Sequence, residues 1–258
     1  MQQPQAFHTY FSPGQPHILA HRGFASVGTA ENTIEAFTAA LSLGATHIES
    51  DVQVTLDGVP VLFHDDDLLR VAGIPRKINE LSFSELTNIV LSEGGRIPAL
   101  REALTSLEEA RFNLDLKVSA AVLPAIELIR ELGAEDRVLV TSFSDRRRAE
   151  AVAAIGGRVA SSAGTGRVLA LWAAAKLRLG SVVRRLARPI QALQIPVGKG
   201  PIRFDSVNFI RQMTSAGLYL HYWTINEPNE MLRLIGLGAT GIVTDRTDIA
   251  VKTLRKAR

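Results

Sequence analysis

The chain has 258 residues, of which 46% are hydrophobic and 21% charged, a composition typical of a folded protein with a large core rather than of a disordered one. It contains no cysteine, which excludes disulfides, thiolate zinc sites and cysteine nucleophiles. The start, residues 1–8, lacks a basic segment followed by an apolar one, and no apolar stretch is long enough to span a bilayer. We therefore expect a cytoplasmic protein.

Strand-like and helix-like segments alternate along the chain. Strands are predicted near residues 17–20, 48–56, 59–65, 112–117, 138–140, 158–160, 191–193, 218–223 and 241–244. Helices are predicted at 34–43, from 82 onward, and at 98–110, 121–132, 167–186, 205–216 and 228–237, although Gly180 argues against one continuous helix over 167–186. This alternation indicates parallel βαβ units.

About eight such units in one chain of this length favour a closed α/β barrel, the (β/α)8 or TIM barrel, over an open sheet. A small insertion is expected after the third strand, beyond His64. No linker or internal repeat divides the chain, so residues 1–258 are expected to form one domain.

The segment around Asp57-Gly58 is a strong hairpin signal, because this dipeptide separates two apolar-rich runs. A two-residue turn there predicts that Asp51 lies directly opposite His64. Glu49 shares a face with Asp51, because strand side chains repeat every second residue. One face of the hairpin thus gathers two carboxylates and an imidazole, a cluster typical of cation binding or proton chemistry.

Polar residues recur at the ends of the predicted strands. They are His21, Asp51, His64, Lys117, Ser142 and Trp223. In a (β/α)8 barrel the carboxyl ends of the strands form the mouth that carries the chemistry. Trp223 at this level is either core or an apolar wall for a ligand.

Carboxylates Glu49, Asp51 and Asp115 are hard oxygen donors, which suit Mg²⁺ or Ca²⁺ better than zinc. A divalent cation beside Arg22 and Lys117 would make a positive pocket suited to phosphate.

His21 and His64 then fit the roles of general base and general acid, because imidazole titrates near neutral pH. Together these groups describe phosphodiester cleavage. A structural ion-pair network is the competing interpretation of the carboxylates, and residues 65–67 are interpreted as a solvated acidic loop.

The same residues form an ordered pattern that spans nearly the whole chain. It runs through His21-Arg22-Gly23, Glu31-Asn32-Thr33, Glu49-Ser50-Asp51, His64-Asp65, Asn113-Leu114-Asp115-Leu116-Lys117, Trp223-Thr224-Ile225-Asn226 and Gly241-Ile242-Val243-Thr244-Asp245. This pattern resembles the glycerophosphodiester phosphodiesterase family.

The resemblance implies a barrel that hydrolyses glycerophosphodiesters to glycerol 3-phosphate and an alcohol with a divalent cation. By position, His21 and His64 match the family's acid/base pair. Arg22 and Lys117 match its phosphate-binding cations, and Glu49 and Asp51 its metal ligands.

Two positions depart from the family pattern. Asp115 stands where the family usually has Glu, so coordination there is expected to become mediated by water. Ala30 replaces the common Pro before Glu31-Asn32-Thr33, which affects only the rigidity of the helix entry.

Between Glu150 and Asp205 the chain has no acidic residue, and its basic residues include several over 167–188. This segment is interpreted either as an outer helix with a basic solvated face or as a peripheral contact with an anionic membrane. No nucleic-acid partner is expected.

The primary hypothesis is hydrolysis of a small glycerophosphodiester substrate. The alternatives are lysophospholipase D-type hydrolysis of lysophospholipids at a membrane surface, and a catalytically silent protein that binds phosphate lipids.

Overall fold

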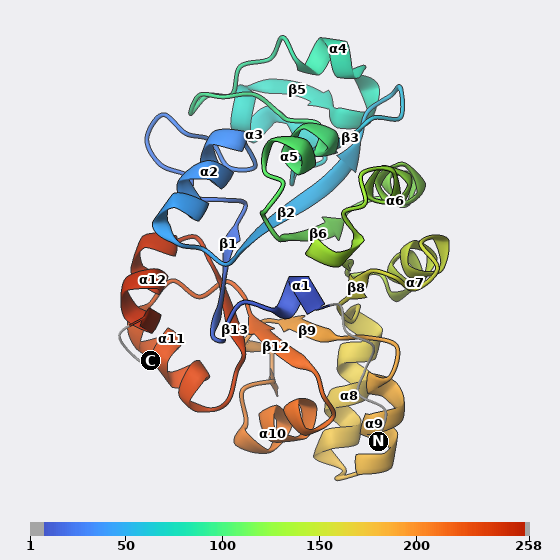
Figure 1. Cartoon of the computed structure of the whole chain (residues 1–258), viewed down its shortest axis with the longest axis vertical. Coiled ribbons are helices and arrows are strands. Elements are labelled where there is room, and N and C mark those ends of the chain that lie inside the picture. Colours follow the sequence, from blue (N-terminus) through green and yellow to red (C-terminus); the bar gives the residue numbers. More distant parts are fainter. Residues whose placement is uncertain (1–7, 256–258) are drawn as a thin grey trace.

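A ring of eight parallel strands surrounds the centre of the described part of the chain, residues 8–255 of a computed structural model (Figure 1). The strands are β1 (His17–His21), β2 (His47–Val54), β6 (Phe112–Leu116), β7 (Val138–Thr141), β8 (Ala160–Ser161), β9 (Ala192–Ile195), β12 (Tyr219–Tyr222) and β13 (Gly241–Thr244). The first strand pairs with the last, and a parallel bridge between Ser162 and Ala192 joins β8 to β9. The predicted (β/α)8 barrel is confirmed.

Helices connect successive strands on the outside of the ring, as parallel strands require. They are α2 (Ile34–Leu43), α5 (Leu100–Ser106), α6 (Val122–Glu131), α7 (Asp145–Ala154), α8 (Thr165–Lys176), α9 (Gly180–Ala187), α10 (Val207–Ser215), α11 (Pro228–Gly236) and α12 (Thr247–Arg255). The predicted helix over 34–43 has both expected ends: the Thr33 hydroxyl accepts a hydrogen bond from the Ala36 amide, and Gly44 ends the helix at φ 106°.

The basic segment 167–188 forms two helices rather than one. The chain turns between α8 and α9 at Arg178, whose φ is 57°, and α9 begins at Gly180. Leu169 and Leu179, which one continuous helix would place on its apolar side, are 41% and 45% exposed. The predicted break at Gly180 is confirmed.

The hairpin between β2 and β3 (Pro60–Leu62) is present, but its register differs by one residue from the prediction. Val52 pairs with Leu62, and the Phe63 amide donates to the Asp51 carbonyl, so Phe63 and not His64 lies opposite Asp51. The cause is a three-residue loop in place of a two-residue turn.

Thr55 closes this loop. Its amide donates to the Val59 carbonyl at 3.0 Å, and its hydroxyl accepts from the Val59 amide at 2.9 Å. Gly58 takes the left-handed conformation, at φ 82°, that the last residue of such a loop requires.

The expected insertion follows β3 and packs on a small core of its own. It contains β4 (Asp67–Leu68), α3 (Leu69–Ala72), β5 (Ile74–Lys77), a 3-10 helix (Ile78–Glu80) and α4 (Phe83–Leu86). Its core comprises Val61, Phe63, Leu68, Ile78, Leu81, Leu86, Leu91 and Ile97. The helix expected from residue 82 onward is present as α4, and Ser82 and Glu85 form a capping box at its start.

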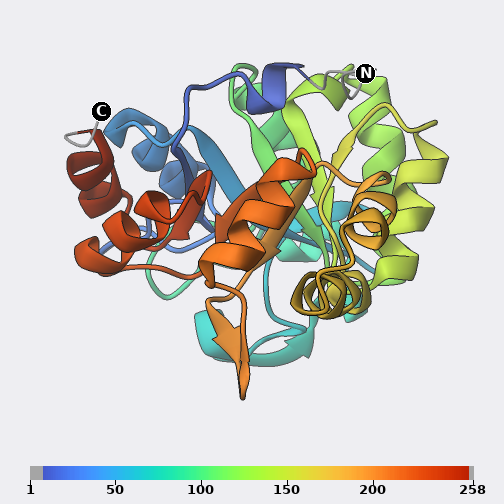
Figure 2. The same ribbon diagram turned by 90° about the horizontal axis from the view of Figure 1, so that it is seen from below.

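Figure 2 shows that this insertion and the hairpin of β10 (Gly198–Lys199) and β11 (Ile202–Arg203) project from the same end of the barrel. The short helix α1 (His8–Phe11) covers the opposite end, which we call the closed end. There Tyr10 is fully buried, and Phe11 stacks on Tyr219 with ring centroids 3.9 Å apart.

Across residues 8–255, no helix has the length and apolar character needed to cross a membrane. Residues 1–7 lie outside the described part of the chain, so the expectation that the start carries no leader sequence remains a prediction.

Candidate active site

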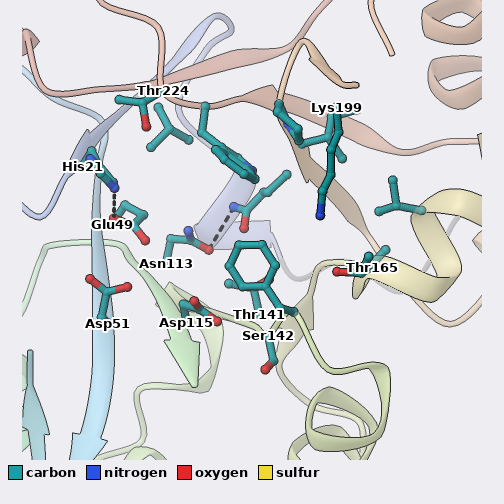
Figure 3. Close-up of a pocket in the computed structure, with 18 of the residues that line it drawn as sticks. His21, Glu49, Asp51, Asn113, Asp115, Thr141, Ser142, Thr165, Lys199 and Thr224 are labelled. Carbon is teal, nitrogen blue, oxygen red and sulfur yellow. Dashed lines mark hydrogen bonds and ion pairs between the residues drawn. The ribbon is translucent and has the colours of Figure 1, made fainter. Parts of the chain in front are cut away.

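A cavity of about 570 Å³ opens at the carboxyl ends of the strands, at the mouth of the barrel (Figure 3). Its lining includes every residue that the sequence predicts for the site: His21, Arg22, Glu49, Asp51, His64, Asp115, Lys117 and Trp223. His64 lies at the cavity despite the shifted hairpin register, because β3 ends at Leu62 and the chain leaves the strand before reaching it.

The turn after β1 shapes one edge of the cavity. Arg22 adopts the left-handed conformation, with φ 58°, and its amide donates to the Glu49 carbonyl at 2.9 Å. Gly23 follows at φ 85°, where an added Cβ would lie 2.8 Å from the backbone of Ala36 on α2. Such a sparsely populated conformation at a polar cluster is typical of a functional site.

The carboxylates of Glu49, Asp51 and Asp115 and the Lys117 ammonium form the floor of the cavity. Lys117 Nζ lies 2.7 Å from Asp51 Oδ1 and 2.9 Å from Asp115 Oδ2. The Asn32 amide donates to Asp51 Oδ2 at 3.3 Å, and the Ser50 hydroxyl donates to Asn32 Oδ1 at 2.6 Å. Asn32, which the sequence places beside the helix cap, therefore holds a carboxylate of the site.

Burial and mutual repulsion separate the acidities of the carboxyls. Burial raises the pKa of Glu49 to about 7, and the Asp51 charge acts in the same direction. Burial also raises the pKa of Asp115, although Lys117 opposes it. For Asp51 burial acts upward too, but the Lys117 ammonium outweighs it and holds the pKa of Asp51 below its usual value.

The His21 side chain is hydrogen-bonded to a carboxylate, Asp245, in the connection between β13 and α12. Its Nδ1 donates to Asp245 Oδ1 at 2.6 Å, and the Asn226 amide donates to Asp245 Oδ2 at 2.8 Å. Its Nε2 faces Glu49 Oε2 at 4.0 Å. Burial lowers the pKa of His21, but the hydrogen bond to Asp245 and the charge of Glu49 outweigh it, so the net shift is upward.

His64 is held by its neighbour in sequence. Its Nδ1 donates to Asp65 Oδ1 at 2.6 Å, and Arg70 Nε donates to Asp65 Oδ2 at the same distance. Arg70 also donates to Glu31 Oε1 at 2.5 Å, and that oxygen accepts from Arg22 Nη1 at 2.8 Å. A chain of ion pairs thus links the second histidine to the arginine predicted to bind phosphate.

The opposite half of the cavity is mainly apolar. Its apolar lining residues are Phe143, Ala163, Val168, Leu169, Ile195, Pro196, Ile202, Phe204 and Trp223. Trp223 packs edge-to-face on Phe143, with ring centroids 6.0 Å apart. Of the two sequence interpretations of Trp223, its position supports the apolar wall.

Several residues that organise this site were not predicted. The interpretation of residues 65–67 as a solvated acidic loop is wrong at Asp65, which binds both His64 and Arg70. Its place directly after His64 was the available signal. Asp245 ends the motif over 241–245, but no local pattern pairs it with His21, which is 224 positions away.

The donor set fits a hard divalent cation in its chemistry. Glu49, Asp51 and Asp115 offer only oxygen atoms, and Asp115 Oδ1 is buried without a hydrogen-bond partner. Within residues 8–255, however, no group of three or more His, Cys, Asp or Glu side chains is arranged as a metal-binding cluster. In this structure the Lys117 ammonium fills the space between Asp51 and Asp115.

Residues 21–249 match the model of the glycerophosphoryl diester phosphodiesterase family. The chain belongs to this family. It is 38% identical over 231 residues to the probable glycerophosphodiester phosphodiesterase 2 of Mycobacterium tuberculosis, covering 90% of this chain and 88% of that protein.

Two further similarities extend across the chain. It is 28% identical over 261 residues to the glycerophosphodiester phosphodiesterase of Caldanaerobacter subterraneus subsp. tengcongensis, covering 93% of this chain and 98% of that one. The fold matches the structure of an Oleispira antarctica phosphodiesterase in complex with its product sn-glycerol-3-phosphate, with a TM-score of 0.75, 23% identity, and 93% and 97% of the two chains covered.

Proposed function

We propose that this phosphoric diester hydrolase cleaves glycerophosphodiesters to glycerol 3-phosphate and an alcohol. The observation that carries the proposal is a pair of carboxylate-held histidines, His21 and His64, in one cavity with Arg22 and three buried carboxyls. Family membership supports the same reaction class, and the Mycobacterium tuberculosis relative carries that activity in its name.

In the proposed reaction, Arg22 binds the substrate phosphate because a guanidinium donates paired hydrogen bonds to an oxyanion. His21 removes the proton from the nucleophile through Nε2. The nucleophile is either water, which gives glycerol 3-phosphate directly, or the substrate's own glycerol hydroxyl, which gives a cyclic phosphate that water then opens to glycerol 3-phosphate. His64 gives a proton to the departing alcohol oxygen, so that no alkoxide is released. Asp245 and Asp65 fix the orientation and tautomer of the two rings.

Glu49, Asp51 and Asp115 would hold the divalent cation, Mg²⁺ or Ca²⁺, which supplies positive charge to the phosphate oxygens when bound. The Lys117 ammonium pairs with Asp51 and Asp115, so a cation held by these carboxylates would compete with the two ion pairs. Lys117 would then bind the substrate phosphate, the role predicted for it.

The test is release of glycerol 3-phosphate from glycerophosphoethanolamine by protein treated with EDTA and then supplied with Mg²⁺ or Ca²⁺. We expect turnover to vanish on chelation and to return with one of the ions. Asp51→Asn should abolish the recovery. Asp248→Asn, which alters a surface carboxylate paired with Arg246, should not.

Absence of glycerol 3-phosphate under every condition would refute the proposed reaction. Full turnover after chelation would refute only the metal requirement.

A second candidate, lysophospholipase D-type activity at a membrane, is favoured by the connection between α8 and α9. There Leu177 is 68% exposed among Lys176, Arg178 and Arg184, an arrangement suited to an anionic lipid surface. Sedimentation with phosphatidylglycerol vesicles tests this contact. Leu177→Asp should abolish binding, whereas Leu123→Asp on α6 should leave it intact; equal binding by both variants would contradict the contact.

A further inference from the structure

A second cavity lies on the other side of the β10–β11 hairpin from the mouth. Its volume is about 350 Å³, and its lining comes from the C-terminal half of α8 and the residues after it, the hairpin, and the start of α10. Lys199 and Ile202 of the hairpin line the mouth, whereas Pro201 and Arg203 line the second cavity. The function proposed above makes no use of this second cavity.

The lining of the second cavity is basic. Lys176, Arg178 and Arg203 contribute to it, and no described lining residue is acidic. Arg203 is paired with Asp205 at 2.8 Å. Within residues 8–255, however, Lys176 and Arg178 have no carboxylate partner, so two positive charges at one cavity stay uncompensated. Such a concentration of positive charge attracts an anion.

The elements that surround the second cavity are joined to one another by side-chain contacts. The Trp172 indole Nε1 donates to the Arg203 carbonyl at 3.0 Å, which joins α8 to the hairpin. The Gln212 side chain donates to the Ala175 carbonyl at 3.0 Å, which joins α10 to α8. Lys176 Nζ lies 4.9 Å from the centroid of the Trp172 ring. The cavity is therefore preformed, as most small-molecule sites are.

The backbone at Arg178 also distinguishes this cavity. Arg178 adopts the left-handed conformation, and among the described residues the other non-glycine residues with positive φ are Arg22 and Asn32. Arg22 lines the mouth, and Asn32 donates to its carboxylate Asp51. Side chains in this sparsely populated conformation cluster at functional sites, because folding alone does not favour them. The conformation of Arg178 therefore supports a binding role for the second cavity.

Helix α10 begins at the second cavity. Its N-cap residue Ser206 and the nearby Asn208 line the cavity, and its first turn contains no acidic residue. The first amides of a helix have no partner within the helix, and the helix dipole favours negative charge at this end. The start of α10 therefore adds hydrogen-bond donors for an anion to the two uncompensated cations.

We propose that the second cavity binds a small phosphate monoester in its dianionic form. Two uncompensated positive charges match the charge of this group at neutral pH, whereas a phosphodiester carries a single charge. Arg178 donates paired hydrogen bonds to phosphate oxygens, and Lys176 supplies a point charge. A volume of about 350 Å³ lies near the lower end of the ~300–1,000 Å³ typical of ligand sites, so the ligand is small.

The first experiment is a fluorescence titration with two matched probes, methyl phosphate and dimethyl phosphate. The chain has two tryptophans, so Trp223→Phe leaves Trp172 as the only indole reporter. An anion that draws Lys176 away from the Trp172 ring changes the emission of that ring. At neutral pH and constant ionic strength, methyl phosphate should give a saturable change and bind about tenfold more tightly than dimethyl phosphate, because it carries the greater charge. A signal without saturation, or equal affinities, would overturn the proposal.

Charge variants with a matched control test the location of the site. Arg178→Gln and Lys176→Gln each remove one charge from the cavity lining, and each should weaken methyl phosphate binding by about threefold to tenfold. Arg185→Gln removes the same charge from α9, outside the cavity lining, and should keep the wild-type affinity. Equal losses in the three variants would mean that the protein responds only to its net charge, which would contradict the site.

A lipid head group is the alternative source of the same phosphate chemistry. Leu177, on which the membrane contact considered above depends, does not line the second cavity. Leu177→Ser should therefore leave methyl phosphate binding unchanged. Binding to vesicles that contain phosphatidic acid, without binding of methyl phosphate, would overturn the proposal in favour of a membrane contact. None of these measurements requires turnover, so their failure would leave the proposed phosphodiesterase reaction unaffected.

Discussion

Histidines lie at both ends of the barrel, but their hydrogen-bond partners differ between the two ends. At the mouth, His21 and His64 each donate Nδ1 to a carboxylate, Asp245 and Asp65 respectively, at 2.6 Å. Both rings line the open cavity. Burial lowers the pKa of His21, but the hydrogen bond to Asp245 and the charge of Glu49 outweigh it and raise that pKa.

At the closed end three histidines, His17, His47 and His221, are fully buried. His17 Nδ1 and His221 Nε2 share a hydrogen bond of 3.1 Å, and His47 Nε2 donates to the Tyr10 carbonyl at 2.7 Å. Burial, and the nearby His17, lower the pKa of His47 and of His221 well below the usual value. The rings of His47 and His221 are therefore held neutral.

One residue type thus serves two purposes in one barrel. A carboxylate partner at the mouth prepares a ring for proton transfer, and burial beside other imidazole rings at the closed end makes a ring part of the core. The comparison predicts that variants at the mouth affect turnover and variants at the closed end affect stability.

The largest effect is expected at the mouth. His21→Gln and His64→Gln should each lower kcat by about 10²- to 10⁴-fold, the usual contribution of a general acid or base. Because neither ring is part of the core, the urea midpoint of unfolding should stay at the wild-type value. A variant that lost stability but kept kcat would contradict the assignment of these two rings to turnover.

Asp245→Asn should produce a smaller loss, about tenfold to a hundredfold in kcat, the range seen when a partner that orients a functional histidine is changed. The hydrogen bond and charge of Asp245 raise the pKa of His21, so the variant should lower that pKa. An NMR titration of the His21 ring measures the shift. An unchanged ring pKa would show that Asp245 does not set the protonation of His21.

At the closed end, His47→Ala should lower the free energy of unfolding by about 1–3 kcal/mol, because the Tyr10 carbonyl loses its buried donor. Urea unfolding at neutral pH measures this change. The kcat of the folded variant should equal the wild-type value. A selective loss of kcat would mean that the closed end communicates with the mouth.

The depressed pKa values at the closed end also predict acid sensitivity. Below about pH 6.5 an unfolded histidine binds a proton. His47 and His221 remain neutral in the folded state to lower pH, so the unfolded state is favoured as pH falls.

The slope from each ring is up to about 1.4 kcal/mol per pH unit. Urea unfolding between pH 6.5 and 5 should show this loss, and His221→Gln should reduce its slope. An identical slope in the variant would remove His221 from the explanation.

The sequence was sufficient for the barrel because its main signals are local. Thr33 and Gly44 bracket α2 as their capping preferences predict, and the strand segments lie within about two residues of their predicted places, except that β3 ends at Leu62 instead of near residue 65. Helix α7 was not predicted, because its buried side includes Arg148 and Ala151 rather than large apolar residues.

The sequence predicted which residues lie at the site, but not the contacts that they make. The register of the hairpin differs from the predicted one because the Thr55 hydroxyl closes a longer loop than Asp57-Gly58 suggests. The bond between His21 and Asp245 depends on β1 meeting β13, which only the closed ring provides. Partners that lie far apart in the sequence leave no periodic pattern from which their contact could be predicted.

The weakest part of the ring lies between β8 and β9. Strand β8 has two residues, and its junction with β9 consists of the Ser162–Ala192 bridge and adjoining hydrogen bonds, whereas β2 and β6 are joined through five paired positions. The elements after β8 and β9 are α8 and the β10–β11 hairpin, which carry much of the apolar wall. Transient parting of this seam would widen the cavity on its apolar side and leave the histidines undisturbed, and rapid deuterium uptake at the amide of Ala163 would mark it.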